Sequence, residues 1–209
     1  MDDQPSNDSL EIVATEVRGC PKCELARTRT NAVPGDGNPN ARVMLVGEGP
    51  GWHEDLQGLP FVGNAGKYLN ELLGKAGLNR EDVFITNVVK CRPPSNRDPL
   101  PDEMAACAPY LDRQIALIDP EVIVTLGRFS MARWFPGEKI THIHGQPKRV
   151  GNRLIVPMYH PAYALRQITV RSQIEADFEK LPRILATAED QREADSNREE
   201  PPAAQMTLF

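Results

Sequence analysis

The chain has 209 residues, of which 40% are hydrophobic, and it carries a formal net charge of −5. This length and composition are typical of one domain with a single hydrophobic core. The sequence has no apolar run long enough to cross a bilayer, and its polar start, MDDQPSNDSLE, lacks the basic and apolar regions of a signal peptide. These features argue against an integral membrane protein, and we expect a cytoplasmic monomer.

Acidic residues are concentrated towards both ends of the chain. Nine of the 29 Asp and Glu residues and two of the 24 Lys and Arg residues lie outside residues 9–188, so this central segment has 20 acidic and 22 basic residues and a net charge of +2. We predict a disordered N-terminus at 1–8, one domain at 9–188 and a disordered acidic tail at 189–209. A nearly neutral domain can still carry a basic face for nucleic acid, although scattered solvated arginines are equally plausible. The candidate basic residues are Lys90, Arg92, Arg97, Lys148, Arg149, Arg166 and Arg171.

The apolar pattern predicts helices that alternate with buried strands. A first helix is expected from residue 9 to about 17, with Ser9 or Asp8 as its N-cap. The expected strands are 42–46, 82–89, 121–126 and 153–158. The other expected helices lie between Gly66 and Gly77 and at 101–118, 129–135 and 169–188. This alternation predicts an α/β fold with a mostly parallel sheet covered on both faces.

Residues 47–66, GEGPGWHEDLQGLPFVGNAG, form a glycine-rich loop between the first expected strand and a helix. Such a loop lies at the carboxyl edge of the sheet, where open α/β folds bind ligands. Its first three glycines leave room for a ligand to lie against the backbone, Glu48 adds a carboxylate and Phe61 adds a flat apolar face. This combination suits a planar polar ring better than a phosphate. A nucleotide loop of Rossmann or P-loop type is the alternative, although the spacing matches neither motif.

Polar side chains follow the ends of three expected strands. Glu48 comes after the first strand, Asn87 lies near the end of the second, and His160 comes directly after the fourth. Parallel strands deliver their carboxyl ends to one edge, so we expect these side chains to converge; an antiparallel strand among the three would prevent it. A turn-forming Asn and a structural loop His are the alternatives that the residues alone leave open.

Cys20, Cys23, Cys91 and Cys107 are the four cysteines, and the first two form a C-x-x-C pair. A reducing cytosol argues against disulfides, and four thiols that include such a pair indicate a metal centre. Zinc and a [4Fe–4S] cluster can both use four thiolates. The wide gap between the pairs does not resemble a two-knuckle zinc ribbon, so we favour the cluster, with unrelated buried thiols as the alternative. Its expected role is structural, because it would tie the first helix to the segment after the second strand.

Taken together, the motifs resemble those of the family 4 uracil-DNA glycosylases, the iron–sulfur type. They are GEGPG-x-x-ED-x-x-G-x-PFVG-x-AG, TN-x-x-KCRPP-x-NR-x-P, the four cysteines and HPAYALR, in family order over roughly residues 17–185. The resemblance implies a three-layer αβα sandwich around a central four-stranded, mostly parallel sheet. It also implies a [4Fe–4S] cluster on the four cysteines, and hydrolysis of the bond between uracil and deoxyribose in DNA that leaves an abasic site.

The resemblance also implies a role for each matched residue. Glu48 and Gly49 would border the flipped base, Phe61 would stack on it, Asn87 would read its polar edge, and His160 would face the oxygen that gains charge. Glu48 and His160 are thus the implied catalytic residues. Family 1 relatives carry Asp where this chain has Gly49, so we interpret Glu48 as a positioning or polarising residue.

Elementary chemistry supports these roles. Breaking a glycosidic bond builds negative charge on the departing base, and a hydrogen bond from His160 can stabilise it. The amide of Asn87 offers a donor and an acceptor, which match the imide N–H and carbonyl of uracil, whereas cytosine presents the opposite pattern.

The base must leave the duplex before it can react, and something must fill the gap. Leu165 and Arg166 follow His160 closely enough to lie over the same edge, so we predict Leu165 as a wedge and Arg166 as a phosphate contact. A core leucine and a surface arginine are equally plausible.

The sequence also indicates what the chain does not do. No lysine stands in the catalytic motifs as an amine nucleophile, so we predict a monofunctional enzyme. Relatives that trap DNA covalently carry a basic insert ending in His between the third and fourth cysteines, but residues 92–106 here read RPPSNRDPLPDEMAA, and trapping is not expected. His142 and His144 in THIHG could form a metal pair, but alternating residues on a short strand or loop fit them better.

The chain ends in QMTLF, in which Gln205, Leu208 and Phe209 resemble the short peptides that dock on sliding clamps. An ordinary frayed terminus is equally plausible.

Two functions from other classes compete with the glycosylase. One is a non-catalytic iron–sulfur module that binds nucleic acid or assists a polymerase, and intact Glu48, Asn87 and His160 argue against it. The other is a nucleotide-binding enzyme that uses the loop at 47–51, and the absence of a phosphate-loop lysine weakens it.

Overall fold

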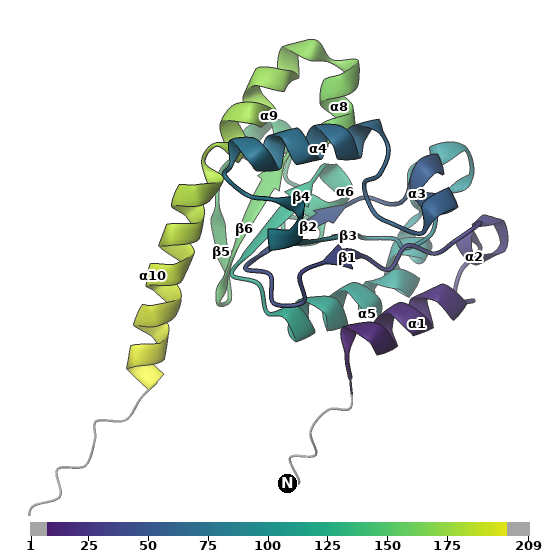
Figure 1. Ribbon diagram of the computed structural model, residues 1–209, viewed down its shortest axis with the longest axis horizontal. Helices are drawn as coiled ribbons and strands as arrows, with labels where there is room; N and C mark the ends of the chain where they lie inside the picture. The colour runs from purple at the N-terminus through teal and green to yellow at the C-terminus, as the bar shows by residue number, and fades with distance from the viewer. Residues whose placement is uncertain (1–7, 200–209) are drawn as a thin grey trace, which may run out of the picture.

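The computed structural model describes residues 8–199. Figure 1 shows a central sheet with α1 and α5 below it and α4, α8 and α9 above it. The three-layer α/β arrangement expected from the sequence is therefore confirmed. The clamp-like peptide with Gln205, Leu208 and Phe209 lies outside the described residues, as do residues 1–7.

Within residues 8–199 the sheet has six strands in the order β1-β3-β2-β4-β6-β5. The four central strands are parallel, and the two edge strands pair antiparallel to their neighbours. The central strands are β2 (Val43–Gly47), β3 (Val83–Asn87), β4 (Val122–Leu126) and β6 (Arg153–Met158), and the edge strands are β1 (Asp36–Gly37) and β5 (Lys148–Val150). The sequence predicted the central four, whose short apolar runs are buried, but not the two largely exposed edge strands.

The helices divide between the two faces because successive strand residues point in opposite directions. Val43 and Leu45 face one core and Met44 and Val46 face the other. The first core is covered by α4 (Asn64–Lys75), α8 (Pro161–Arg166), α9 (Arg171–Phe178) and α10 (Leu181–Glu199). The second is covered by α1 (Leu10–Gly19), α2 (Leu25–Thr28), α5 (Pro101–Ile118), α6 (Arg128–Ala132) and α7 (Ile140–Ile143). The remaining elements are α3 (Trp52–Gln57), η1 (Arg80–Asp82), η2 (Pro94–Asn96) and η3 (Ile168–Val170).

The helix expected at 169–188 is divided in the structure. η3 and α9 are followed by a break near Glu179, after which α10 starts with Pro182 in its first turn, a position that proline favours. α10 packs against β4 and β6 and continues to Glu199, so residues 189–199 are helical where a disordered tail was expected.

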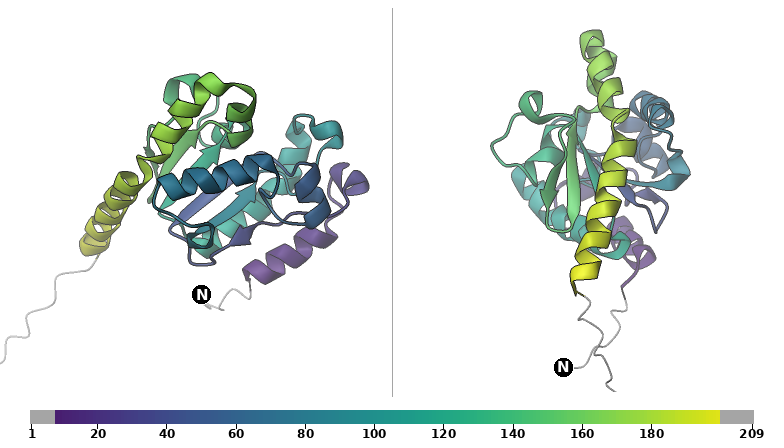
Figure 2. Two further views of the ribbon diagram at one scale, coloured as in Figure 1. Left: turned by 45° about the horizontal axis from the view of Figure 1, so that its top comes forward. Right: turned by 90° about the vertical axis from the view of Figure 1, so that its left-hand side faces the viewer.

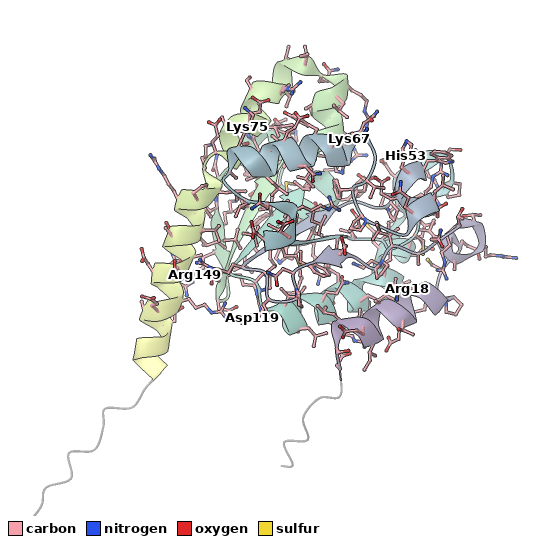
Figure 3. The ribbon with its side chains drawn as sticks, viewed as in Figure 1. Arg18, His53, Lys67, Lys75, Asp119 and Arg149 are labelled. Carbon is pink, nitrogen blue, oxygen red and sulfur yellow. The ribbon has the colours of Figure 1, made fainter. Side chains whose placement is uncertain are left out.

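Ion pairs from distant segments tie the second half of α10 to the sheet. Arg192 pairs with Asp119, and Asp195 pairs with Arg149. Figures 2 and 3 show α10 along one side of the sheet, and Figure 3 labels Asp119 and Arg149 on the side of the molecule where α10 lies. Such pairs join residues far apart in the chain, so the local composition of 189–199 could not reveal them.

The first three residues of the THIHG segment lie in a one-turn helix, α7, and His144 is its C-cap, where a short strand or loop was expected. His142 is exposed, whereas Nδ1 of His144 lies 2.6 Å from Oδ2 of the buried Asp177. No helix within residues 8–199 is both long and apolar enough to traverse a lipid bilayer.

Candidate active site

One cavity of about 290 Å³ opens at the carboxyl edge of the parallel strands. Glu48, Asn87 and His160 all line it, and so do Gly49 and Phe61. The sheet register explains part of this arrangement, because Gly47 at the end of β2 lies opposite Asn87 at the end of β3. The structure therefore brings the sequence-predicted side chains together, while their chemical roles stay predictions.

Phe61 forms an aromatic wall of the cavity. Its ring lies 5.5 Å from the ring of His160, with 23° between the two planes. Its backbone has φ of +50°, in the left-handed region that a bulky residue rarely adopts. A strained backbone of this kind costs on the order of 1–3 kcal/mol, so neighbouring contacts must hold it.

Two charged side chains hold the Phe61 loop. The carboxylate of Glu54 accepts hydrogen bonds from the backbone N–H groups of Gly51, Val62 and Gly63 at 3.1, 2.9 and 2.9 Å. The guanidinium of Arg80 donates to the carbonyls of Pro60 and Phe61. In the sequence Glu54 is one of several carboxylates in the loop, and nothing there indicates a role for Arg80. The backbone groups that both side chains contact come together only in the folded loop.

Two of the glycines make room for the chain itself. A β-carbon at Gly47 would lie 2.3 Å from Oδ1 of Asn87 and 2.8 Å from the Phe61 ring, and one at Gly49 would lie 2.7 Å from Cγ2 of Val89. The sequence had predicted that these glycines leave space for a ligand. The missing side chain at Gly47 instead leaves space for the side chains of Asn87 and Phe61, whereas Gly49 does line the cavity.

Asn87 carries an unsatisfied polar atom. Its side chain is buried, and its Oδ1 has no hydrogen-bond partner within residues 8–199. Leaving a buried acceptor unpaired costs about 1–3 kcal/mol. Because Asn87 lines the cavity, a ligand with a suitably placed N–H group would satisfy this oxygen.

His160 is the N-cap of α8, and this position fixes its tautomer. Its Nδ1 accepts a hydrogen bond from the backbone N–H of Ala162 at 3.1 Å. The neutral ring must therefore carry its proton on Nε2. Burial, aided by the charge of Arg166, lowers the pKa of His160 to about 4. At neutral pH the ring is an uncharged donor.

Glu48 is partly buried among charged groups. Burial raises its pKa above the ordinary value, and the negative charge of Asp98 adds to this effect, whereas Arg128 and Arg166 oppose it. The carboxyl group thus lies within the field of two guanidinium groups, of which that of Arg166 lines the cavity.

Lys90 is buried, which contradicts its inclusion among the candidate basic surface residues. Its Nζ donates to the carbonyl of Asn87 at 2.9 Å, to Oε1 of Gln114 at 2.7 Å and to Oγ1 of Thr86. Burial lowers its pKa to about 8. Thr86 and Asn87 point to opposite faces of β3, so the amine lies on the face away from the cavity. Its apolar neighbours Val88, Val89 and Cys91 were the one sequence signal for burial.

Residues of α8 form another part of the cavity rim. Arg166 and Tyr163 line the cavity, and the Leu165 side chain is 51% exposed. The structure thus excludes a core position for Leu165. Ile168, in the following turn, is the most exposed large apolar residue of those described, and the sequence analysis did not single it out.

The four cysteines line a second, smaller cavity, together with residues of α1 and α5. The Sγ atom of Cys91 accepts a hydrogen bond from Arg29 at 3.1 Å, and that of Cys107 accepts one from the backbone N–H of Lys90 at 3.3 Å. Burial raises the pKa of both thiols, that of Cys107 to about 11. Within the described residues, no three His, Cys, Asp or Glu side chains are arranged to hold a single metal ion.

The fold and the larger cavity define a three-layer α/β protein with a cavity at the carboxyl edge of its parallel strands. A family model described as the uracil DNA glycosylase superfamily matches residues 34–181. The type-4 uracil-DNA glycosylase of Saccharolobus solfataricus is 49% identical over 86% of this chain and 88% of its own length. Type-4 enzymes of Sulfurisphaera tokodaii and Thermotoga maritima are 52% and 47% identical, over 86% and 82% of this chain and 86% and 92% of their own lengths. The chain therefore belongs to the uracil-DNA glycosylase superfamily, within its type-4 group.

The packing of Gly66 beneath the Phe61 loop predicts a strong effect of an added methyl group. A β-carbon at Gly66 would lie 1.8 Å from the carbonyl oxygen of Phe61, so Gly66→Ala should lower the free energy of unfolding by about 1–3 kcal/mol. Gly74 lies in the same helix with nothing within 4 Å of its β-carbon position, and Gly74→Ala should raise it by about 0.5–1 kcal/mol. Urea unfolding of both variants measures the difference. Equal effects would show that the Phe61 backbone moves freely.

The environment of His160 predicts that its ring stays neutral well below pH 6.5. A folded pKa of about 4 lies below the ordinary value of about 6.5, so the unfolded chain binds more protons between these values. The contribution of this group to stability is complete above about pH 6.5 and is lost as the pH falls towards 4. Nitrogen-15 NMR of the imidazole, assigned with a His160→Leu variant, should show an Nε2–H tautomer at pH 5.5. A titration midpoint near 6.5 would contradict this.

Proposed function

We propose that this chain hydrolyses the N-glycosidic bond of deoxyuridine in DNA, releasing uracil and leaving an abasic site. The observation that carries the proposal is the unpaired Oδ1 of Asn87 in a cavity that Phe61 and the neutral His160 also line. A volume of about 290 Å³ is at the lower end of the range for small-molecule pockets, which suits a single extruded base. The names of the relatives, type-4 uracil-DNA glycosylases, agree with this activity.

Recognition of uracil rests on Asn87 and Phe61. The ring of Phe61 offers an apolar plate for the base, and the amide of Asn87 offers an acceptor and a donor for the imide N–H and the neighbouring carbonyl. Cytosine has a ring nitrogen acceptor where uracil has that N–H, so cytosine would leave Oδ1 unpaired and facing another acceptor. A site with buried polar groups rejects a ligand that cannot pair them.

Catalysis rests on His160 and Glu48. As the bond between C1′ and the base breaks, its electron pair moves onto the base, and Nε2–H of His160 donates a hydrogen bond to the oxygen that gains this charge. A water molecule then supplies the oxygen that bonds to C1′, and its proton balances the charge of the departing base. Glu48 positions or polarises this water and the sugar, where positive charge develops.

Access to the base rests on α8. Extruding a base from duplex DNA costs a few kcal/mol of pairing and stacking. The half-exposed Leu165 fills the vacated space in the duplex, and Arg166 contacts a phosphate while lining the cavity.

The reaction is monofunctional. No lysine is among the cavity-lining residues of the described chain, and the amine of Lys90 is engaged on the other face of β3. An amine nucleophile of the kind that cleaves an abasic site is therefore not at hand.

The four cysteines fit a [4Fe–4S] cluster. All four line one cavity, and the N–H donors of Arg29 and Lys90 already point at two of the sulfurs, as suits thiolate ligands. When bound, the cluster would supply cross-links between α1 and the segments that carry Cys91 and Cys107. Its role is therefore structural.

Other parts of the proposal concern partners. The peptide with Gln205, Leu208 and Phe209 would dock on a sliding clamp and so deliver the enzyme to newly made DNA. The monomeric state and the cytoplasmic location stay predictions from the sequence.

The activity is tested by incubating the purified protein with a uracil-containing single-stranded oligonucleotide and then adding alkali. Strand breaks at the uracil should appear after alkali only, and borohydride should trap no protein–DNA adduct. His160→Ala should lower kcat by about 100- to 1,000-fold, because it removes the donor to the developing anion. His142→Ala, at an exposed histidine, is the matched control and should leave kcat unchanged. An inert wild-type protein that still binds DNA would instead indicate a non-catalytic module.

The cluster is tested with Cys91→Ala. The wild-type protein should be brown and contain about four iron and four sulfide per chain, whereas zinc without sulfide would mean a different centre. The variant should lose colour and thermal stability before it loses the chemistry of the cavity, since the cysteines line a separate cavity. A colourless Cys91→Ala protein with wild-type stability and full activity would contradict the structural role.

A further inference from the structure

Trp52 is exposed beside the cavity. Its side chain is 51% exposed, although tryptophan is highly buried on average. Leu56, four residues later on the same face of α3, is 47% exposed, and Leu59 in the following turn is 43% exposed. We refer to Trp52, Leu56 and Leu59 as the α3 ridge. An apolar ridge of this kind marks an interaction surface more often than a single exposed leucine does.

The α3 ridge begins directly after a residue that lines the cavity. Gly51, which caps α3, and Glu54 in its first turn both line the cavity. The Trp52 ring meets the His53 ring edge to face, with 4.8 Å between the centroids. His53, labelled on α3 in Figure 3, packs in turn on the Phe61 loop, because a β-carbon at Gly63 would lie 3.2 Å from its ring.

The helix that carries the ridge is firmly anchored. The buried carboxylate of Asp55 accepts hydrogen bonds from the backbone N–H groups of Thr30 and Asn31, at 2.9 and 3.4 Å. The Asn31 amide donates back to the carbonyls of Asp55 and Leu56. The exposure of Trp52 is therefore a property of a fixed surface, and a ligand that stacks on it has little backbone to order.

The ridge lies on a different helix from the residues proposed to contact DNA. Leu165 and Arg166 belong to α8, whereas Gly51 and Glu54 approach the cavity from α3. A strand whose uracil occupies the cavity and whose backbone contacts Arg166 must continue past the rim in both directions. The α3 ridge offers that strand a flat aromatic face and apolar edges, without a charged group on the ridge itself.

We propose that the α3 ridge is a stacking platform for an unpaired base that flanks the extruded uracil on the same strand. This inference rests on the proposed function. Every base has a π-face, so stacking on Trp52 favours single-stranded DNA of any sequence. In a duplex the flanking bases are already stacked and paired, so stacking on Trp52 contributes much less free energy to binding. The ridge thereby makes the chain more efficient on unpaired uracil, in contrast to a wedge such as Leu165, which acts on the duplex.

The experiment compares kcat/KM for uracil release from matched single-stranded and duplex oligonucleotides. Trp52→Ala should lower kcat/KM on single strands by about 5- to 150-fold, the range for loss of one base stack, with a smaller loss on duplex. Trp52→Phe should keep most of the activity. Leu165→Ala should instead lower kcat/KM more on the duplex than on single strands. Val150→Ala removes a similarly exposed apolar side chain from β5 and is the control that should change neither value.

A double-mutant cycle separates stacking from a structural effect. Bases next to the uracil are replaced one at a time by a baseless tetrahydrofuran nucleotide. At one flanking position the baseless substrate should give the same kcat/KM with wild type and Trp52→Ala, because the base that stacks on the Trp52 ring is already absent. As a binding readout, Trp52 fluorescence in a Trp134→Phe background should be quenched by a uracil-free single strand.

Three results would overturn the platform while leaving the glycosylase intact. The first is an equal kcat/KM of wild type and Trp52→Ala on single strands. The second is that the losses from Trp52→Ala and from removal of a flanking base are additive at every flanking position. The third is Trp52 fluorescence that single strands leave unchanged. In each case uracil release by the wild type still supports the proposed function. If the wild type releases no uracil from any oligonucleotide, the proposed function itself fails.

Discussion

The side chains of Asn87 and Phe61 meet across Gly47, and the rest of the site depends on this close approach. Parallel pairing places Asn87 opposite Gly47, and a β-carbon there would lie 2.3 Å from Oδ1 of Asn87. A larger residue at this strand end would clash with both side chains and force a shift. This part of the cavity wall is thus built by the register of two strands together with one missing side chain, and His160, the N-cap of α8, adds to it.

Elements with a strong local pattern could be predicted from the sequence. β2, β3, β4 and β6 are short apolar runs buried on both faces, and their alternation with helices determined the layered fold. The edge strands carry no buried run and were missed. The break before α10 and its extension to Glu199 were missed as well, and the ion pairs of this extension to Asp119 and Arg149 join residues far apart in the chain.

The same distinction holds within the site. Glu48, Asn87 and His160 could be placed together because parallel topology brings strand ends to one edge. Glu54, Arg80 and Lys90 could not be given roles, because each acts through backbone groups that only the folded loops present. Lys90 is the clearest case: a lysine that composition assigns to the surface instead joins the carbonyl of Asn87 to Thr86 and Gln114 beside the cysteine cavity.

Three contacts hold the left-handed backbone of Phe61. Arg80 donates to its carbonyl, and Glu54 accepts from the next two backbone N–H groups. The carbonyl also packs closely on Gly66, which has no side chain. The conformational entropy of this loop is therefore lost when the chain folds and not when a base arrives. A ligand that enters the cavity therefore meets a Phe61 loop that the folded chain already holds in place. Under the proposed function, the selection of a base then depends on its fit to a loop that is ordered in advance.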